Sequence, residues 1–206
     1  MASAIGAWSG DNTTEDSIGT ADGFWNGTPS YGPGLVGAAA FAFQGAQFVK
    51  APAFDYTGAF SLSFWAKANA VQSANTGLVA SAETNLDLAK TFQVDWGSFG
   101  RYRLRAGTAT APLSLDIGAA STTAFQHIVV TYDGATEVRT YLDGEPVATG
   151  TWTGEPLLFT AMKIGVNRGQ SYRYNGTIDD VYVFSRALSA NEVRAVFHGQ
   201  GAGICP

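Results

Sequence analysis

Cysteine is almost absent from this chain of 206 residues. The one cysteine, Cys205, lies next to the C-terminal residue and has no partner for an internal disulfide bond. We expect it to be a leftover thiol, and the alternative is a residue whose partner lies in a longer chain. The cysteine content therefore does not decide between an oxidising and a reducing compartment.

Charge is also scarce. Charged residues make up 14% of the chain, and 17 acidic residues outnumber 12 basic ones, which gives a net charge of −5. Nucleic acids and anionic lipid surfaces are bound through an excess of basic residues, so the sequence predicts neither partner. Acidic residues that gather in loop-like segments favour a cation instead.

Long apolar runs are missing. No run approaches the ~18–20 residues of a membrane span, so we expect no membrane insertion. The first four residues, 1–4, contain neither the basic nor the apolar part of a signal peptide. The chain is then either cytoplasmic or a piece of a longer exported protein. We predict the second, with a secreted or cell-surface location as part of a larger protein.

The chain is rich in apolar residues and glycine, and in several segments apolar and polar residues alternate. Hydrophobic residues make up 46%, and 25 glycines suit many short strands joined by tight turns. Alternation with period two is typical of strands that bury one face. It occurs in segments 60–67, 101–105, 125–132, 138–142 and 178–184. With no internal repeat, we predict one all-β domain over residues 1–206, a two-sheet antiparallel sandwich.

One helix start is recognisable, near the C-terminus. Ser189 and Glu192 have the spacing of a capping box, in which the serine hydroxyl accepts the glutamate amide while the carboxylate reaches back. Val193 and Val196 supply an apolar stripe, and Gly199 ends the helix. We expect this short helix to lie outside the sandwich.

Several strand-like segments, in their order along the chain, resemble those of laminin G-like jelly-roll domains of the concanavalin A-like lectin/glucanase superfamily. The matching segments are 8–11, 34–37, 40–43, 60–67, 125–134, 141–147, 174–184 and 186–193. One departure is Phe125, where the family usually has tryptophan. The resemblance implies a jelly roll of two antiparallel sheets. It also implies an appended module of an extracellular protein, of a kind that often binds glycans, sometimes proteins, and often calcium.

Catalytic patterns are few. Hydrolysis of a glycosidic bond needs two carboxyl groups that face one cleft, and the alternating acidic strand used by sandwich enzymes does not occur here. Glu137 and Glu145 lie eight residues apart. His127, in the middle of a predicted strand, is expected to be a half-buried histidine bonded to a neighbour. We therefore predict that the chain is not an enzyme, with a glycan-cleaving enzyme of the same fold as a weaker alternative.

Two segments combine aromatic rings with polar side chains, as sugar sites do. The first, residues 95–102, supplies Trp96, Arg101 and Tyr102, and the second, residues 167–174, supplies Asn167, Arg168, Tyr172 and Tyr174. The alternative is that these aromatics cover the edge of the core. A row of three arginines, Arg101, Arg103 and Arg105, could bind acidic sugars, although we expect a solvated face paired with acids on a neighbouring strand.

Oxygen ligands concentrate in an N-terminal loop. Calcium takes ~6–8 oxygen ligands from irregular backbone. The resemblance implies that an early acidic loop and the acidic pair of the last strand can meet, which suggests Asp11 and Asp16 with Asp179 or Asp180. The alternative is that these residues cap turns in a solvated loop.

The functional hypothesis from the sequence is a non-catalytic, lectin-like module that binds glycans and is stabilised by calcium. A protein-interaction or adhesion module without sugar affinity is the alternative. The residues expected to be buried between the sheets are Phe60, Leu62, Phe64, Ile128, Val130, Tyr141, Leu157, Ile164, Ile178 and Val181.

Overall fold

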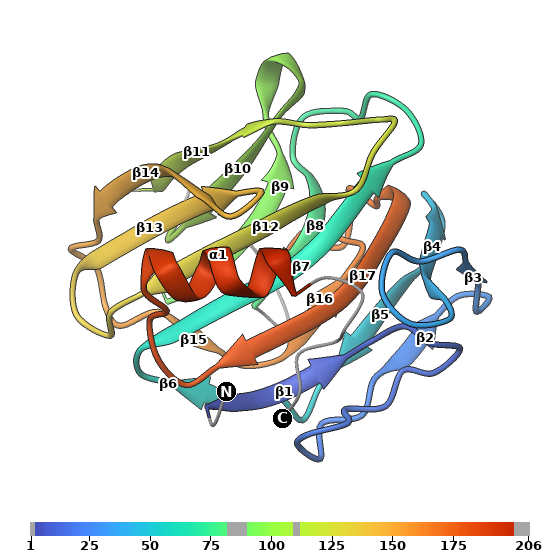
Figure 1. Cartoon of the computed structure of the whole chain (residues 1–206), viewed down its shortest axis with the longest axis horizontal. Coiled ribbons are helices and arrows are strands. Elements are labelled where there is room, and N and C mark those ends of the chain that lie inside the picture. Colours follow the sequence, from blue (N-terminus) through green and yellow to red (C-terminus); the bar gives the residue numbers. More distant parts are fainter. Residues whose placement is uncertain (1–2, 82–89, 109–111, 200–206) are drawn as a thin grey trace.

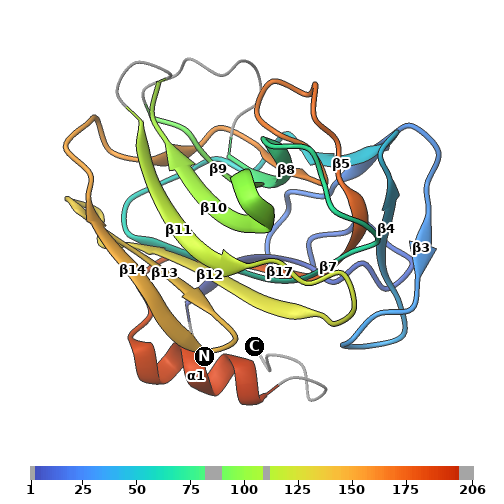
Figure 2. The same cartoon turned by 90° about the horizontal axis from the view of Figure 1, so that it is seen from above.

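The computed structural model describes residues 3–81, 90–108 and 112–199, and in it two antiparallel sheets pack face to face (Figures 1 and 2). Cys205 lies outside the described residues. The predicted two-sheet antiparallel sandwich is confirmed. No helix in the described ranges is long and apolar enough to cross a membrane.

Sheet A has eight strands in the order β14-β13-β12-β7-β17-β4-β3, and β1 pairs with β17 beside this path. Its strands are β1 (Ala4–Trp8), β3 (Tyr31–Gly32), β4 (Ala40–Gln44), β7 (Phe60–Ala68), β12 (Gln126–Tyr132), β13 (Glu137–Leu142), β14 (Glu145–Thr151) and β17 (Asn175–Phe184).

Sheet B has seven strands in the order β11-β10-β9-β8-β16-β5-β2. They are β2 (Phe24–Asn26), β5 (Phe48–Ala51), β8 (Thr76–Ala80), β9 (Phe92–Trp96), β10 (Arg101–Ala106), β11 (Leu113–Ala119) and β16 (Met162–Ile164). A small third sheet pairs β6 (Tyr56–Thr57) with β15 (Leu158–Phe159). A 3-10 turn, η1 (Ser98–Gly100), joins β9 to β10.

Period-two patterning decides which side chains fill the space between the sheets. In β7, Phe60 and Leu62 are fully buried in the central core, where the ring of Phe60 stacks on that of Phe92 in sheet B with 4.9 Å between centroids. Nine of the ten predicted core residues lie in this central cluster. These are Phe60, Leu62, Phe64, Ile128, Val130, Leu157, Ile164, Ile178 and Val181.

The tenth predicted core residue, Tyr141, is buried on the other side of sheet A. It belongs to a second apolar cluster with Val129 and Val193. Val138 and Leu142 pack against the central core, so regular alternation along β13 turns Tyr141 outward. The expectation that Tyr141 lies between the sheets is therefore wrong.

The helix α1 (Ala190–His198) covers this outer cluster and lies outside the sandwich, as Figure 2 shows. The capping box is present: the Ser189 hydroxyl accepts from the Glu192 amide, and the Glu192 carboxylate accepts from the Ser189 amide. A hydrogen bond from Arg186 and those from Ser189 lower the pKa of Glu192 to about 2. The predicted helix and its cap are confirmed.

Several connections meet at one end of the sandwich, because the antiparallel order brings the corresponding strand ends together. They are residues 27–30, 45–47, 69–75, 97–100, 120–125 and 165–174. Neighbouring connections are bonded to one another. The Ala120 amide donates to the Gly100 carbonyl at 2.9 Å, and the Gly45 amide donates to the Tyr174 carbonyl at 2.9 Å.

Candidate functional site

The turn between β9 and β10 has an unusual backbone. Phe99 has φ of 60° and Gly100 has φ of 68°, in the left-handed region that favours glycine. The turn is closed by a 2.6 Å hydrogen bond from the Gly97 amide to the Arg101 carbonyl. Phe99 is 99% exposed, so this turn carries an aromatic ring into solvent.

The strand that follows presents its arginines to solvent. Alternation in β10 buries Tyr102 and Leu104 and turns Arg101 and Arg103 to the outer face of sheet B. Arg101 forms a two-point ion pair with Asp116 on β11.

Arg103 forms a second two-point ion pair, through Nε and Nη2, with the fully buried carboxylate of Asp95 on β9. Arg105 donates to the side chain of Asn75 at 3.0 Å. The prediction that Arg101, Arg103 and Arg105 form a strand face paired with acids on neighbouring strands is thus confirmed for the first two.

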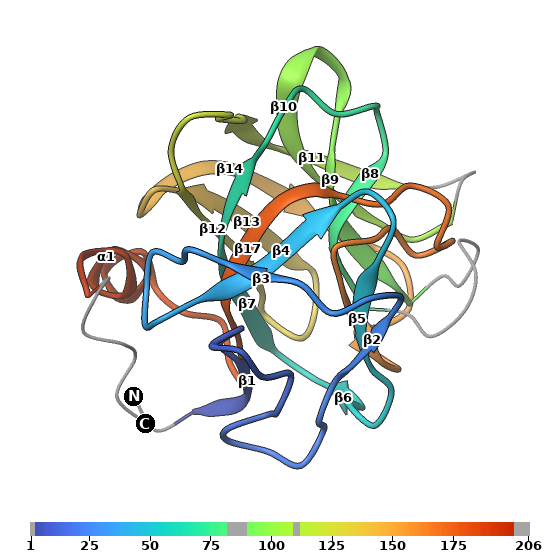
Figure 3. The same ribbon diagram turned by 90° about the vertical axis from the view of Figure 1, so that its right-hand side faces the viewer.

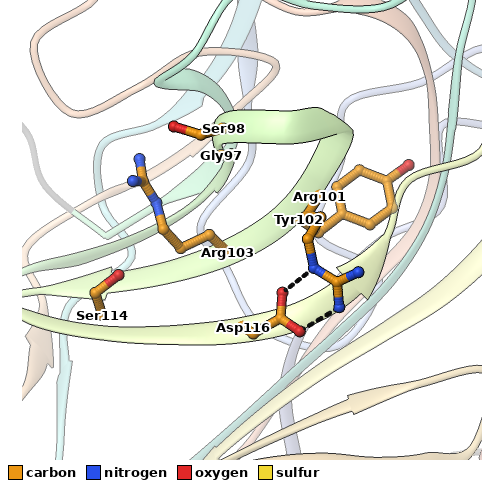
Figure 4. A pocket seen from close by; sticks show the side chains of 7 residues that line it. All are labelled: Gly97, Ser98, Arg101, Tyr102, Arg103, Ser114 and Asp116. Carbon is orange, nitrogen blue, oxygen red and sulfur yellow. Dashed lines mark hydrogen bonds and ion pairs between the residues drawn. The ribbon is translucent and has the colours of Figure 1, made fainter.

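These side chains border a pocket of about 200 Å3, here called the arginine pocket (Figure 4). Its lining residues are Gly97, Ser98, Arg101, Tyr102, Arg103, Ser114 and Asp116. The hydroxyls of Ser98 and Ser114 and the Nη1 atoms of Arg101 and Arg103 make no hydrogen bond within the part of the chain that the structure describes. The pocket therefore offers donors and acceptors with the arginine charges already balanced by aspartates.

Three of the aromatic residues predicted to form a sugar platform are buried. Trp96 is 2% exposed, and Tyr102 and Tyr174 are 0% exposed. Trp96 and Tyr102 meet edge to face, with 5.6 Å between centroids, in the central core. The prediction of an exposed platform made from these three rings is therefore wrong: Trp96 and Tyr102 point inward from β9 and β10, and Tyr174 is buried in the same core from the connection before β17. The alternative interpretation, aromatics that cover the core, is the one that the structure has.

Two polar residues predicted for the same site, Arg168 and Asn167, instead hold the loop 165–174 in place through hydrogen bonds. Arg168 is 1% exposed and donates from Nη1 to the carbonyl oxygens of Thr91 and Gly107, at 2.9 and 3.0 Å. Asn167 is 2% exposed, and its side-chain oxygen accepts from the amides of residues 171 and 172. Their prediction as surface ligands is wrong, since both are buried where the loop packs on sheet B.

Of the seven predicted ligand-binding residues, Arg101 and Tyr172 have exposed side chains. Arg101 lies in the arginine pocket, and Tyr172, 46% exposed, lies on the loop 165–174. The exposed Phe99 was not among the seven. A signal for it exists in the sequence, because an aromatic residue between a serine and a glycine in a strand-to-strand turn has no core to enter.

Asp11 and Asp179 both accept hydrogen bonds from the backbone of the segment 35–39. Asp11 Oδ1 accepts from the amides of Ala38 and Ala39, and Asp179 Oδ2 accepts from those of Leu35 and Val36. The pairing of β1 with β17 places the N-terminal loop beside the last strand. Asp179 Oδ1 is buried and has no hydrogen-bond partner among the described residues.

Asp180 lies close enough to Asp11 and Asp179 to interact with their charges, and these three residues are called the acidic cluster here. A β-bulge interrupts β17 after Asp179, and Asp180 has φ of 48°. Burial, then the charges of Asp179 and Asp11, raise the pKa of Asp180 to about 7. Burial, with a smaller contribution from Asp11, raises the pKa of Asp179 to about 6.

Asp16 plays a different part. Its carboxylate accepts four backbone N–H groups, and it is 6% exposed. The donors are the amides of Ala7, Ile18, Gly19 and Ala21. These bonds fold the loop 16–21 around the carboxylate, which is the turn-capping role given above as the alternative. Within the described ranges, no group of three or more His, Cys, Asp or Glu side chains could hold a metal ion.

Comparisons with known proteins agree with this architecture. The laminin G-type family model, described as the concanavalin A-like lectin/glucanases superfamily, matches residues 43–194. No curated protein is similar enough in sequence to be matched.

Solved structures share the fold at low sequence identity. Domain 4 of AbnA, a GH43 extracellular arabinanase from Geobacillus stearothermophilus, in complex with arabinotriose, has a TM-score of 0.76 at 20% identity, over 94% of this chain and 98% of that chain. The binding domain of botulinum neurotoxin DC in complex with rat synaptotagmin II has a TM-score of 0.76 at 15% identity, over 96% of this chain and 51% of that chain. The same toxin domain in complex with SialylT has a TM-score of 0.76 at 16% identity, over 96% and 52%. This chain thus spans about half the length of the toxin chains.

Proposed function

Because this chain belongs to the laminin G-type family of the concanavalin A-like lectin/glucanases superfamily, we propose that it is a non-catalytic module that binds neutral glycans at the arginine pocket. The observation that carries the proposal is the set of unengaged donors and acceptors in that pocket. The bound arabinotriose of the AbnA domain and the ligands of the toxin domains support glycan or protein binding as the general class.

The charges of the arginine pocket favour a neutral ligand. Arg101 and Arg103 each already hold an aspartate at two points. An acidic sugar would have to displace Asp116 or leave the buried Asp95 unpaired, which is costly. The remaining N–H groups and the serine hydroxyls suit the alternating donors and acceptors of sugar hydroxyls.

The same ion pairs argue for binding without catalysis. The hydrogen bond from Arg101 lowers the pKa of Asp116, which keeps this carboxylate ionised and unsuited to act as a general acid. Burial raises the pKa of Asp95, but its side chain is 0% exposed and cannot reach a substrate. Glycoside hydrolysis needs an accessible pair of carboxyl groups with opposite roles.

The exposed ring of Phe99 completes the proposed site. It lies in the turn that supplies Gly97 and Ser98 to the pocket. Aromatic rings stack on the apolar face of sugars, and a solvent-exposed ring at a strained turn serves no packing purpose. Phe99 takes the place that the sequence had suggested for Trp96 and Tyr102.

The test is binding of neutral oligosaccharides, on a glycan array and then by calorimetry, to the wild type and to pocket variants. Ser114→Ala and Arg101→Ala are each expected to lower affinity by about 2–10-fold, the loss of one or two hydrogen bonds. Arg139→Ala is the matched control, because the Arg139–Glu137 pair is as exposed as the Arg101–Asp116 pair (45%/45% against 46%/42%). No binding of any neutral glycan, or equal losses in control and pocket variants, would refute the proposal.

A protein-interaction module is the second candidate, supported by the synaptotagmin complex of the toxin binding domain. The exposed large apolar side chains of the described residues come from separate segments, and three of them, Val71, Phe99 and Tyr172, lie on connections at one end of the sandwich. The full set is Phe24, Leu35, Val71, Phe99, Val147 and Tyr172. We favour glycan binding because the unengaged polar groups of the arginine pocket suit sugar hydroxyls.

We also propose calcium at the acidic cluster. Two observations support this proposal: Asp179 has a buried carboxylate oxygen without a partner, and no salt bridge of the described residues involves Asp179 or Asp180. The few carboxylates would need main-chain carbonyls and water to reach the ~6–8 oxygens that calcium takes. Asp179, with Asp11 or Asp180, would supply part of the ligand set, whereas the oxygens of Asp16 are already occupied by backbone amides.

The location proposed for the module is extracellular, as part of a larger protein. The AbnA relative is described as extracellular, which supports this proposal.

A further inference from the structure

A second pocket lies at the edge of the sandwich that Figure 3 faces, between the connections 27–30 and 45–47. Its volume is about 410 Å3, and it is called the edge pocket here. The lining residues are Gly27, Thr28, Pro29, Ser30, Gln44, Ala46 and Gln47. We propose that the edge pocket is a second binding site, which takes a neutral, hydroxyl-rich sugar residue.

The chemistry of the lining residues is the first support for a sugar site in the edge pocket. The pocket has two hydroxyls, two carboxamides and one proline ring, and none of its lining residues is charged. The side chains of Thr28, Ser30 and Gln44 make no hydrogen bond within the ranges that the structure describes. Hydroxyls and carboxamides both donate and accept, as sugar hydroxyls do, so a neutral polyol is the ligand class that satisfies them.

The walls of the edge pocket are held in place from behind. One wall, 27–30, runs between Trp25 and Tyr31, whose rings meet edge to face at 5.6 Å and are joined by a 3.0 Å hydrogen bond from the indole to the phenol oxygen. Gly27 has φ of 105°, and a Cβ there would lie 2.9 Å from the Cβ of Gln47. The two walls thus approach each other closely at Gly27 and Gln47.

The other wall, 45–47, is fixed by Arg173. Its guanidinium donates to the carbonyl of Ala46 and lies over the ring of Phe48, 5.4 Å from the centroid. A pocket with both walls fixed does not have to be ordered by its ligand, which lowers the cost of binding.

The edge pocket and the arginine pocket belong to the same end of the sandwich. The connection 97–100, which helps to form the arginine pocket, and the connections 27–30 and 45–47 follow strands that end on that side. Strands β10 and β2 are five places apart in sheet B, so the two pockets are separated by roughly 24 Å at ~4.8 Å per strand. This separation makes them two sites rather than parts of one, and each is testable alone.

The experiment is an NMR titration of the whole chain with four neutral trisaccharides, arabinotriose, xylotriose, cellotriose and mannotriose, at millimolar concentration. We expect at least one to shift the side-chain amide signals of Gln44 and Gln47 and the backbone signals of Gly27 and Ser30. The double variant T28A/Q44A is expected to weaken this binding by about 5-fold or more, the loss of one or two hydrogen bonds. The control is Thr57→Ala, an exposed threonine on β6, outside both pockets.

The outcomes separate this proposal from the one for the arginine pocket. Shifts confined to the arginine pocket overturn the edge site and leave the proposed function standing. Shifts confined to the edge pocket support the edge site and refute the arginine pocket as the glycan site. No shift in either pocket with any of the four sugars overturns both.

Discussion

The Nε2 of His127 lies 2.8 Å from the Oγ of Ser63, across the paired strands β12 and β7 and beneath α1. The imidazole is packed between aromatic rings, 4.8 Å from the centroid of Trp65 and 6.1 Å from that of Phe197 on the helix. His127 is 0% exposed, more deeply buried than the half-buried residue expected from the sequence. The predicted hydrogen bond to a neighbour is confirmed.

The first prediction concerns pH. Burial lowers the pKa of His127 from 6.5 to about 3, so the unfolded chain binds this proton at a higher pH than the folded one does. The contribution of His127 to stability is therefore present above about pH 6.5 and is lost as pH falls towards 3, by about 1.4 kcal/mol per pH unit. His127→Asn is expected to make the free energy of unfolding depend less on pH in this range. Urea unfolding between about pH 7 and pH 4 measures this dependence.

Ser63→Ala is the control for this prediction. It removes the hydrogen bond to His127 but leaves the titrating imidazole in place. We expect it to lower the free energy of unfolding by about 1 kcal/mol with the pH slope unchanged. Parallel profiles for the wild type and His127→Asn would show that the imidazole does not titrate in the way described.

A second prediction concerns Phe99. Its left-handed backbone costs ~1–2 kcal/mol in a residue with a side chain, and asparagine tolerates this conformation better. Phe99→Asn is therefore expected to leave the melting temperature unchanged or raise it. If the ring stacks on sugar, the same variant loses about 2–10-fold in glycan affinity, the factor of a ~0.5–1.5 kcal/mol aromatic contact. Undiminished affinity would exclude Phe99 from the site.

The third prediction separates Asp179 from Asp16. A calcium ion bound at the acidic cluster stabilises the folded chain, so chelator is expected to lower the melting temperature of the wild type. Asp179→Asn is expected to abolish this response, because it removes a carboxylate with an unpaired oxygen.

Asp16→Asn provides the contrast. It weakens four backbone hydrogen bonds, so it is expected to lower the melting temperature equally with and without chelator. A wild-type melting curve that chelator leaves unchanged would refute calcium binding.

The fourth prediction tests the assignment of faces in β7. Leu62 is 0% exposed in the central core, so Leu62→Ala is expected to lower the free energy of unfolding by ~2–5 kcal/mol. Val147→Ala, at a position 41% exposed on β14, is the control and is expected to change it by less than about 0.5 kcal/mol. Chemical denaturation of both variants measures the difference, and equal losses would contradict the assignment.

Much of the fold could be predicted because its rules are local. A strand with apolar residues at every second position has one face to bury, which is why nine of the ten core residues were identified from their spacing. The capping box at Ser189 is local as well, since both partners lie within one helical turn. Tyr141 shows the limit: alternation groups the residues of β13 into two faces, but both faces of this strand are covered, one by sheet B and one by α1.

The candidate site was less predictable from the sequence. Within residues 95–102, the aromatic side chains that the sequence suggested as exposed are not the ones that the structure exposes. Trp96 and Tyr102 are buried, and Phe99 is exposed. Both kinds of aromatic look alike in a sequence, and only the position of the turn relative to the two strands decides which ring has a core to enter.

The sequence by itself determined the strand periodicity, the helix with its cap, the pairing of arginines with neighbouring acids and the acidic net charge that disfavours nucleic acids and anionic lipid surfaces. Tertiary structure alone decided which distant segments meet. Asp11 lies beside Asp179 because β1 pairs with β17, and Arg168 is buried because its loop packs on the outer face of sheet B. The physical reason is that alternation is a property of neighbouring residues, whereas burial and charge crowding depend on contacts between strands far apart along the chain.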